Sequence, residues 1–309
     1  MHILFHAADA NPAPWLADLQ EALPDAELRV WQEGDNGPAD HAIVWKPPAA
    51  MLRGRTDLKA IFNLGAGVDA ILQLGDALPA GVPIVRLDDA GMGVQMAEYV
   101  SHAVLRYFRR FDQFAMQQAL GQWRFAKPQD KTTFSVGILG LGVLGSRIAA
   151  ALAPFGFPLH GWSRTPKSLP GVTCHAGVDG YDAFLRASKV VACVLPLTTD
   201  TADVLDATAL AKMPRGGYVI NVARGAHLVE EDLLAAINSG QIAAATLDVF
   251  RQEPLPADHP FWREPRITIT PHIAAVTLRG DSVRQIAAKI VRLEAGETVP
   301  GTVDRARGY

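Results

Sequence analysis

Short apolar runs alternate with amphipathic segments along almost the whole chain, and this alternation predicts an α/β fold with parallel strands. The segment from Pro12 to Leu23 is expected to be helical, because its large apolar side chains recur at the spacing of one helical face. The strands expected early in the chain are His2–Phe5, Ala42–Trp45, Ala60–Asn63 and Ile84–Leu87. The six expected later are Ser135–Leu139, Leu159–Trp162, Val190–Leu195, Tyr218–Asn221, Ala244–Val249 and Thr268–Thr270, a set that suits a dinucleotide-binding domain.

Two long helical segments flank the second block of strands. One extends from Val94 to Phe111 and the other from Thr277 to Ala295, and we expect them to carry the chain between two domains. A length of 309 residues is enough for two domains of ordinary size. The prediction is two Rossmann-like domains, each a doubly wound parallel sheet. Residues 1–95 plus 277–309 would form a discontinuous substrate domain, and residues 96–276 would form the dinucleotide-binding domain.

A glycine-rich turn stands between a predicted strand and a predicted helix, which we expect from Ser146 to Phe155. In the sequence Gly140-Leu-Gly-Val-Leu-Gly145, the first glycine permits a tight turn, the second lets a pyrophosphate approach the backbone, and the third allows close helix packing. Free N–H groups at the helix start would attract the phosphates. The expected cofactor contacts here are Gly140, Gly142, Val143, Leu144 and Gly145. A structural turn without a ligand is the alternative interpretation.

The end of the next strand bears on the choice of cofactor. An NAD site usually has an acidic residue about 20 residues after the glycines, where it binds the ribose 2′-hydroxyl. Here the strand ends in Ser163-Arg164-Thr165-Pro-Lys167, which has hydroxyls and cations but no acid. Ser163, Arg164 and Thr165 offer the donors that a 2′-phosphate needs, so we predict NADPH, with NADH as the weaker alternative. A solvated basic loop would also explain these residues.

Composition excludes several classes of protein. A net charge of -3 without a long basic run argues against nucleic acid as the main partner. No apolar stretch of roughly 18 residues predicts a membrane span, and no secretory signal is visible, so we expect a cytoplasmic protein. Cys174 and Cys193 lack disulfide or metal spacing and are expected to be buried and reduced. The histidines likewise lack the spacing of metal ligands, so no metal site is predicted.

Three residues that could carry chemistry stand after predicted strands: Arg224, Glu253 and His272. Ligands of open α/β sheets bind beyond the carboxyl ends of strands. Histidine suits proton donation near neutral pH, a neighbouring carboxylate would orient it, and arginine can bind a substrate carboxylate. Together with a nicotinamide cofactor these groups predict hydride transfer to a carbonyl. Taken singly, each could be a surface residue, and His227 is expected to be a helix-start or surface residue.

Four motifs resemble the signatures of the D-isomer-specific 2-hydroxyacid dehydrogenases: Gly140–Gly145, Asn221–Gly225, Leu247–Leu255 and Thr270–Ala275. The resemblance runs through most of the chain. It implies that Arg224 orients the substrate, that His272 donates the proton with Glu253 paired to it, and that Asp248 holds the nicotinamide carboxamide. A strand-end cap is the alternative role for Asp248.

The resemblance also implies contacts elsewhere in the chain. Asn63–Asp69 is similar to the loop that binds the substrate carboxylate through backbone N–H groups. The residues it assigns to substrate are Trp45, Ala66, Gly67, Met92, Arg224 and His272, and those it adds to the cofactor site are Leu195, Pro196 and Ala223. Trp45 could equally be a core residue. Lys46 stands where a histidine is expected, which could alter substrate preference.

Finer motifs, including Val44–Pro48, Gly91–Met96 and Val303–Tyr309, resemble a bacterial branch that reduces glyoxylate and hydroxypyruvate. The function implied is NADPH-dependent reduction of small 2-keto acids, glyoxylate to glycolate and hydroxypyruvate to D-glycerate. A dehydrogenase for a bulkier 2-keto acid such as phenylpyruvate, or a non-catalytic dinucleotide-sensing binding protein, are the alternatives. Relatives form dimers through the cofactor domain, so we expect a homodimer, with Trp123 to Lys131 as a segment that could reach the partner.

Overall fold

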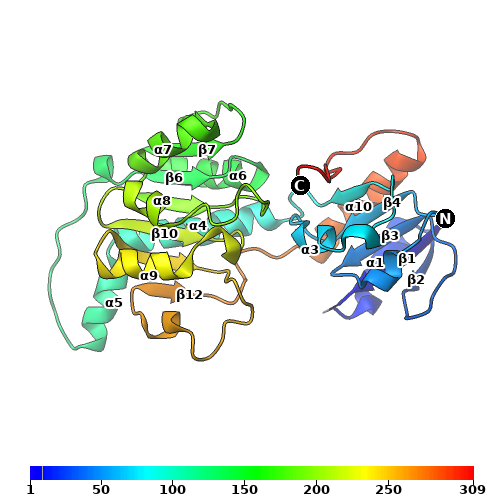
Figure 1. Cartoon of the computed structure of the whole chain (residues 1–309), viewed down its shortest axis with the longest axis horizontal. Helices are drawn as coiled ribbons and strands as arrows, with labels where there is room; N and C mark the ends of the chain where they lie inside the picture. The colour runs from blue at the N-terminus through cyan, green and yellow to red at the C-terminus, as the bar shows by residue number, and fades with distance from the viewer. Residues whose placement is uncertain (9) are drawn as a thin grey trace. The chain divides into compact units, whose positions relative to one another are not determined.

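The computed structural model describes residues 1–8 and 10–309, and its strands form two parallel sheets of five and seven strands (Figure 1). The chain divides into two compact units. Unit 1 comprises Met1–Met92 and Thr277–Tyr309, and unit 2 comprises Gly93–Val276. The α/β architecture predicted from the sequence is confirmed. In the described part of the chain, no helix is long and apolar enough to cross a membrane.

Unit 1 contains a five-stranded sheet with the strand order β2-β1-β3-β4-β5. Its strands are β1 (His2–Ala7), β2 (Glu27–Val30), β3 (His41–Trp45), β4 (Ala60–Asn63) and β5 (Ile84–Arg86). Successive side chains of a strand point to opposite faces, so Ile3 and Phe5 join one core cluster while Leu4 joins the other. Both faces are therefore buried, which explains why these strands are apolar runs without alternation.

Helices cover the two faces of this sheet. They are α1 (Pro12–Ala22), α2 (Ala49–Leu52), α3 (Asp69–Leu72) and α10 (Arg279–Glu294). The first begins where the Asn11 side chain accepts a hydrogen bond from Ala13 N, with Pro12 at its first position. Side chains of α1 and α10 share one core cluster with β1 and β3. After α10 the chain returns to the sheet, where Arg86 N donates to Gly301 O and Val303 N donates to Ile84 O.

Unit 2 contains a seven-stranded sheet with the order β12-β11-β10-β9-β6-β7-β8. Its strands are β6 (Val136–Leu139), β7 (Leu159–Ser163), β8 (Val172–Ala176), β9 (Val190–Cys193), β10 (Gly217–Asn221), β11 (Ile242–Leu247) and β12 (Ile267–Ile269). From β6 the order runs in one direction through β7 and in the other through β9. The carboxyl end between β6 and β9 is thus the switch point at which open α/β sheets bind ligands.

Helices also lie on both faces of the second sheet. They are α4 (Met92–Phe108), α6 (Val143–Leu152), α7 (Gly177–Ala187), α8 (Ala207–Lys212) and α9 (Glu230–Asn238). Between α4 and β6 the chain forms α5 (Phe111–Ala119), which has no buried residue. Residues of α4 and α6 share one core cluster with alternate strand residues, and residues of α7, α8 and α9 share the other (Figure 1). The helix expected from Val94 to Phe111 ends earlier, because Arg110 adopts a left-handed conformation with φ +57° and a new helix begins.

Three other expectations need correction. The strands β2 and β8 were not predicted, and β8 raises the expected six strands of unit 2 to seven. Both are edge strands without a fully buried residue, so their sequences lack an apolar run. Cys174 lies in β8 and is only partly buried, whereas Cys193 is fully buried. The helix expected from Ser146 begins earlier, at Val143, and continues after Leu152 as a short 3-10 helix, Ala153–Phe155.

Candidate active site and cofactor-binding loop

The glycine-rich loop connects β6 to α6 at the switch point of the second sheet. Gly140 has φ +117°, a conformation that L side chains rarely adopt, and a Cβ on Gly145 would lie 1.9 Å from the Gly140 carbonyl oxygen. A Cβ on Gly142, in contrast, would meet nothing within 4 Å. Gly142 is the N-cap of α6, and no side chain caps the helix there. The loop therefore has the space and the donors to hold a pyrophosphate.

The basic segment after β7 fits the additional phosphate of NADP. Ser163 is buried and its hydroxyl donates to Thr165 O at 2.8 Å, while Arg164 and Thr165 are exposed. The Lys167 ammonium donates to Leu141 O at 2.5 Å, so this cation lies at the glycine-rich loop itself. Sequence reasoning did not place Lys167 among the contacts, because only the folded loop brings it to Leu141. Guanidinium, ammonium and hydroxyl groups without a nearby acid in this segment are suited to a phosphate dianion.

Glu253 and His272 form a hydrogen-bonded pair beyond the carboxyl ends of β11 and β12. His272 Nδ1 lies 2.8 Å from Glu253 Oε2, and the side chains are 44% and 36% exposed, which leaves the imidazole open to a ligand. An ionised carboxylate can only accept, so Nδ1 carries the hydrogen. The other carboxylate oxygen, Glu253 Oε1, accepts from Phe250 N at 3.0 Å and fixes the carboxylate in its loop. The structure thus brings together two of the three predicted catalytic residues in direct contact.

Arg224 follows β10 and is linked to the Glu253 loop through its neighbour. A Cβ on Gly225 would lie 1.9 Å from the Phe250 carbonyl carbon, so the backbones of the two loops are in direct contact. The Asn221 side chain accepts from Ala223 N at 3.2 Å and donates to Arg224 O at 2.9 Å, which shapes the turn. The Arg224 guanidinium donates to Ala223 O at 2.7 Å. The segment Asn221–Gly225 therefore needs its asparagine for the hydrogen bonds of the turn and its glycine for close packing.

Asp248 is almost fully buried and holds the segment that carries His272. Its carboxylate accepts from Thr270 Oγ1 at 2.6 Å and from the backbone N–H groups of Ile273 and Ala274, each at 2.8 Å. Asp248 O accepts from His272 N at 2.8 Å. These bonds hold His272 in a left-handed conformation with φ +56°, which is unfavourable for a residue with a Cβ. Asp248 is thus a cap of this segment, and its four lone-pair sites leave capacity for one more donor.

The phenol of Tyr99 extends this network from α4. Its hydroxyl lies 2.5 Å from Thr270 Oγ1, and burial raises the pKa of Tyr99 to about 12. The group therefore stays protonated at neutral pH and serves as a fixed polar contact. The charge of Asp248 nearby adds to this shift.

The expectation that His227 is a surface or helix-start residue is wrong. Its side chain is fully buried in a short 3-10 helix, Gly225–His227, directly after Arg224. Its Nε2 lies 3.2 Å from Pro196 O, and its Nδ1 accepts from Arg224 N at 3.2 Å. The acidic start of α9 suggested an exposed position, but the loop after β9 packs over the histidine, which the local sequence does not reveal.

The residues that the resemblance assigns to the substrate carboxylate lie in unit 1, after β4. Asn63 Nδ2 donates to Gly65 O at 3.1 Å and to Gly67 O at 2.9 Å, and these bonds close the loop. Ala66 and Gly67 remain partly exposed at its tip. The Trp45 ring covers the loop so closely that a Cβ on Gly65 would lie 2.5 Å from it. Trp45 is only partly buried, and Met92, at the start of α4, is buried.

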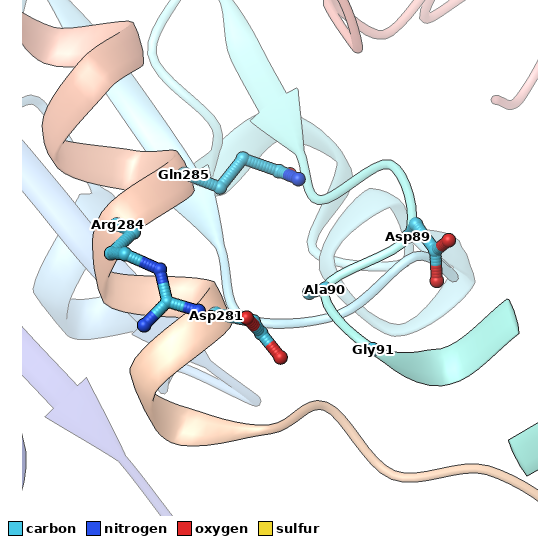
Figure 2. A pocket seen from close by; sticks show the side chains of 6 residues that line it. All are labelled: Asp89, Ala90, Gly91, Asp281, Arg284 and Gln285. Atoms are coloured by element: carbon cyan, nitrogen blue, oxygen red, sulfur yellow. Dashed lines mark hydrogen bonds and ion pairs between the residues drawn. The ribbon is translucent and has the colours of Figure 1, made fainter. Parts of the chain in front are cut away.

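A shallow hollow in unit 1 lies near the start of α10 (Figure 2). It is lined by Asp89, Ala90, Gly91, Asp281, Arg284 and Gln285. Arg284 pairs with Asp281, and Gln285 Oε1 accepts from Asp88 N at 2.8 Å. The hollow contains none of the predicted catalytic residues. In residues 1–8 and 10–309, no group of three His, Cys, Asp or Glu side chains could hold a metal ion.

Known proteins resemble this chain over its full length. Residues 101–274 match the family model described as "D-isomer specific 2-hydroxyacid dehydrogenase, NAD binding domain". Proteins named glyoxylate/hydroxypyruvate reductase A from Yersinia enterocolitica and Serratia proteamaculans are 51% and 52% identical over 313 aligned positions, with both chains fully covered.

Solved structures agree with this assignment. A 2-hydroxyacid dehydrogenase from Xanthobacter autotrophicus Py2 in complex with NADPH and MES has a TM-score of 0.95 and 42% identity, covering 100% of this chain and 99% of that one. An NADPH-dependent glyoxylate/hydroxypyruvate reductase from Sinorhizobium meliloti, in complex with NADP and sulfate, has a TM-score of 0.90 and 34% identity. The match again covers 100% of this chain and 99% of that one. The resemblance inferred from the motifs is confirmed: the chain belongs to the D-isomer specific 2-hydroxyacid dehydrogenase family.

Proposed function

We propose that this chain is an NADPH-dependent reductase of small 2-keto acids, converting glyoxylate to glycolate and hydroxypyruvate to D-glycerate. The observation that carries the proposal is the exposed His272–Glu253 pair at 2.8 Å, in the same unit as an open glycine-rich loop. The names and full-length similarity of the curated relatives support the choice of substrates. The basic segment after β7 and the NADP-bound structural relatives support the choice of cofactor.

In this proposal the side chains of unit 2 stabilise the charges of carbonyl reduction. When bound, NADPH supplies a hydride to the keto carbon of the substrate. His272 donates the proton on its Nε2 to the oxygen that becomes an alkoxide, which typically contributes about 10²–10⁴-fold to the rate. Glu253 accepts from Nδ1 and so orients the imidazole for this transfer. Arg224 binds the substrate carboxylate and polarises the keto oxygen.

The cofactor contacts follow from the loops at the switch point. The backbone of Gly140, Gly142, Val143, Leu144 and Gly145 would hold the pyrophosphate. Ser163, Arg164 and Thr165 would bind the 2′-phosphate, and Lys167 joins them in our proposal because of its position at Leu141 O. Leu195, Pro196 and Ala223 would flank the cofactor. Asp248 would accept the nicotinamide amide with its remaining lone pair. NADH would bind more weakly in the same place.

Residues of unit 1 are also assigned to substrate binding in this proposal. Ala66 and Gly67 would donate backbone N–H groups to its carboxylate, and Trp45 and Met92 would limit its size. Accordingly we assign residues 1–95 plus 277–309 to substrate binding and residues 96–276 to dinucleotide binding.

We also propose a cytoplasmic homodimer. Exposed apolar side chains gather on α5 and the segment after it, namely Phe111, Met116, Leu120, Trp123 and Phe125. Large exposed apolar patches often mark interaction sites, and these residues overlap the segment expected to reach a partner. Sedimentation that shows a monomer at micromolar concentration would contradict the dimer. The cysteines of the described residues are free thiols, which is typical of a reducing compartment.

The test is the initial rate of glyoxylate reduction with NADPH and, separately, with NADH. Fast oxidation of NADPH and slow oxidation of NADH would support the proposed activity and cofactor. Comparable rates would refute the cofactor assignment but not the reaction. No rate with either, together with turnover of phenylpyruvate, would favour a dehydrogenase for bulkier acids, and no turnover at all would favour a binding protein.

A further inference from the structure

His227 is a buried titratable residue that the proposed reaction does not use. It lies between two loops, the one after β9 that contains Pro196 and the one after β10 that contains Arg224. Both ring nitrogens contact backbone atoms: Nε2 lies 3.2 Å from Pro196 O, and Nδ1 lies 3.2 Å from Arg224 N. A histidine held in this way connects the two loops through its ring.

The partners determine where the ring carries its hydrogen. Pro196 O can only accept, so Nε2 must carry the hydrogen, while Arg224 N–H can only donate, so Nδ1 must be bare. Nδ1 also lies 3.1 Å from Arg224 O, but the two lone pairs of that oxygen already accept from Asn221 Nδ2 at 2.9 Å and from His227 N at 3.2 Å. A doubly protonated ring would be a fully buried cation, which is costly without a paired charge. The geometry therefore favours the neutral Nε2–H form.

Further backbone bonds join the same two loops. Leu205 N donates to His227 O at 2.9 Å, and Asp203 N donates to Ala226 O at 2.8 Å. Pro196 O also accepts from Thr201 Oγ1 at 2.7 Å, which orders the turn that carries it. The ring of His227 thus adds side-chain bonds to the backbone bonds that pair the two loops.

We propose that His227 is a positioning residue that couples the cofactor loop at Pro196 to the substrate-binding residue Arg224. The inference rests on the proposed function, in which Leu195 and Pro196 flank the cofactor and Arg224 binds the substrate carboxylate. The bond from Arg224 N–H to Nδ1 fixes the backbone from which the guanidinium projects. The bond from Nε2–H to Pro196 O ties that backbone to the cofactor loop, so an ordered cofactor loop would also order Arg224.

Three variants separate the two bonds of the ring. His227→Asn places an amide oxygen near the position of Nδ1 and can keep the bond from Arg224 N–H. His227→Gln places an amide nitrogen near the position of Nε2 and can keep the bond to Pro196 O. His227→Phe removes both while it keeps an aromatic ring in the buried space. His259→Gln is the matched control, because His259 is a partly buried histidine of the same unit that lies outside the proposed site and is paired with Glu230 at 3.3 Å.

The kinetic readout is KM against kcat for glyoxylate and for NADPH, measured well below the melting temperature of each variant. We expect His227→Phe and His227→Gln to raise the KM for glyoxylate about tenfold or more, the effect of one lost positioning bond. His227→Asn should stay within about threefold of the parent, and His259→Gln should leave both KM values unchanged. A His227→Asn variant as impaired as His227→Phe, or a His227→Phe variant with lowered stability but an unchanged KM, would overturn the proposal.

A second measurement does not depend on turnover. In ¹⁵N spectra of histidine rings, His227 should keep the Nε2–H form between about pH 5.5 and 8, assigned by its loss in His227→Gln, because titration would break a bond to Arg224 N–H. A ring that titrates near pH 6.5, or one with hydrogen on Nδ1, would refute the proposed link. If the parent protein reduces no glyoxylate, the proposed function fails, whereas the ring spectrum still decides the position and state of His227.

Discussion

An alanine at Gly225 should separate the two loops that carry the catalytic residues. The added Cβ would lie 1.9 Å from the Phe250 carbonyl carbon, 2.1 Å from its oxygen and 2.3 Å from Arg251 N. These are backbone atoms, so no side-chain rotation can relieve the overlap and one loop must move. Phe250 N donates to Glu253 Oε1, and therefore this movement would displace the carboxylate that orients His272.

The magnitude follows from the size of the clash. Overpacking in a well-packed region typically costs about 1–3 kcal/mol, and a backbone overlap belongs at the upper end. For a unit of this size, each kcal/mol lowers the melting temperature by roughly 2–4 °C, so we expect a decrease of about 4–12 °C. Because Arg224 and Glu253 would both shift, kcat/KM for glyoxylate should fall on the order of 100-fold, the loss expected when reacting groups are misplaced by about 1 Å.

The assay pairs thermal unfolding with steady-state kinetics, and Gly142→Ala is the matched control. A Cβ at Gly142 meets nothing within 4 Å, so that variant should keep the parent melting temperature to within a few degrees. It should nevertheless bind NADPH poorly, since the methyl group would occupy the space proposed for the pyrophosphate. A Gly225→Ala variant with the parent melting temperature and a rate within about twofold of the parent would refute the argument that backbone contact couples these loops.

Three further changes probe the cofactor, the proton donor and the pH dependence. Arg164→Ala should weaken NADPH binding about tenfold or more and spare NADH, because a charge-assisted bond contributes about 1.5–3 kcal/mol; equal losses for both in a fluorescence titration would disprove the 2′-phosphate role. His272→Ala should lower kcat by about 10²–10⁴-fold without weakening NADPH binding, and unchanged turnover would remove it as the proton donor. Burial lowers the pKa of His160 and of His175, whose rings lie 3.3 Å apart at Nδ1 and Nε2, and the neighbouring His175 ring adds to the lowering of the His160 pKa. The unfolded chain then binds more protons below about pH 6.5, so stability should be complete above that pH and decrease as the pH falls. The urea concentration at the midpoint of unfolding, measured at about pH 7.5 and about pH 5.5, reports this decrease in stability. A variant with both His160→Gln and His175→Gln that loses just as much stability between these pH values would show that other groups are responsible.

The strands that could be predicted from the sequence are those buried on both faces. Ala60–Asn63 is an apolar run in the sequence and is β4 with the same bounds in the structure. Edge strands such as Glu27–Val30 expose half of their side chains and depend on a neighbouring strand, so their local sequence resembles a loop. Arg110 shows another limit, because a left-handed residue that ends a helix has no distinctive side chain.

In the candidate site, contacts that follow from the order of strands can be predicted from the sequence, and contacts that depend on how loops pack cannot. The direct contact of Glu253 with His272 could be anticipated, since both follow parallel strands that end at one edge of the sheet. The burial of His227 could not, because it depends on a loop more than twenty residues earlier, at Pro196, folding over the ring. The three bonds of Asp248 likewise depend on the path of the chain after β12, which the motif alone does not show.

The discontinuity of unit 1 has a consequence for the order of events during synthesis. Strands β1 and β3 emerge from the ribosome early, but Val283, Ile286 and Ile290 of α10, which complete their core cluster, emerge near the end of translation. Unit 2 is one continuous segment and can close its own sheet while α1 alone covers the sheet face that α10 will share. A nascent chain that stalls before Arg279 would therefore present a folded unit 2 together with a partly exposed face of the first sheet. Chaperones bind surfaces of this kind, and aggregation can begin at them.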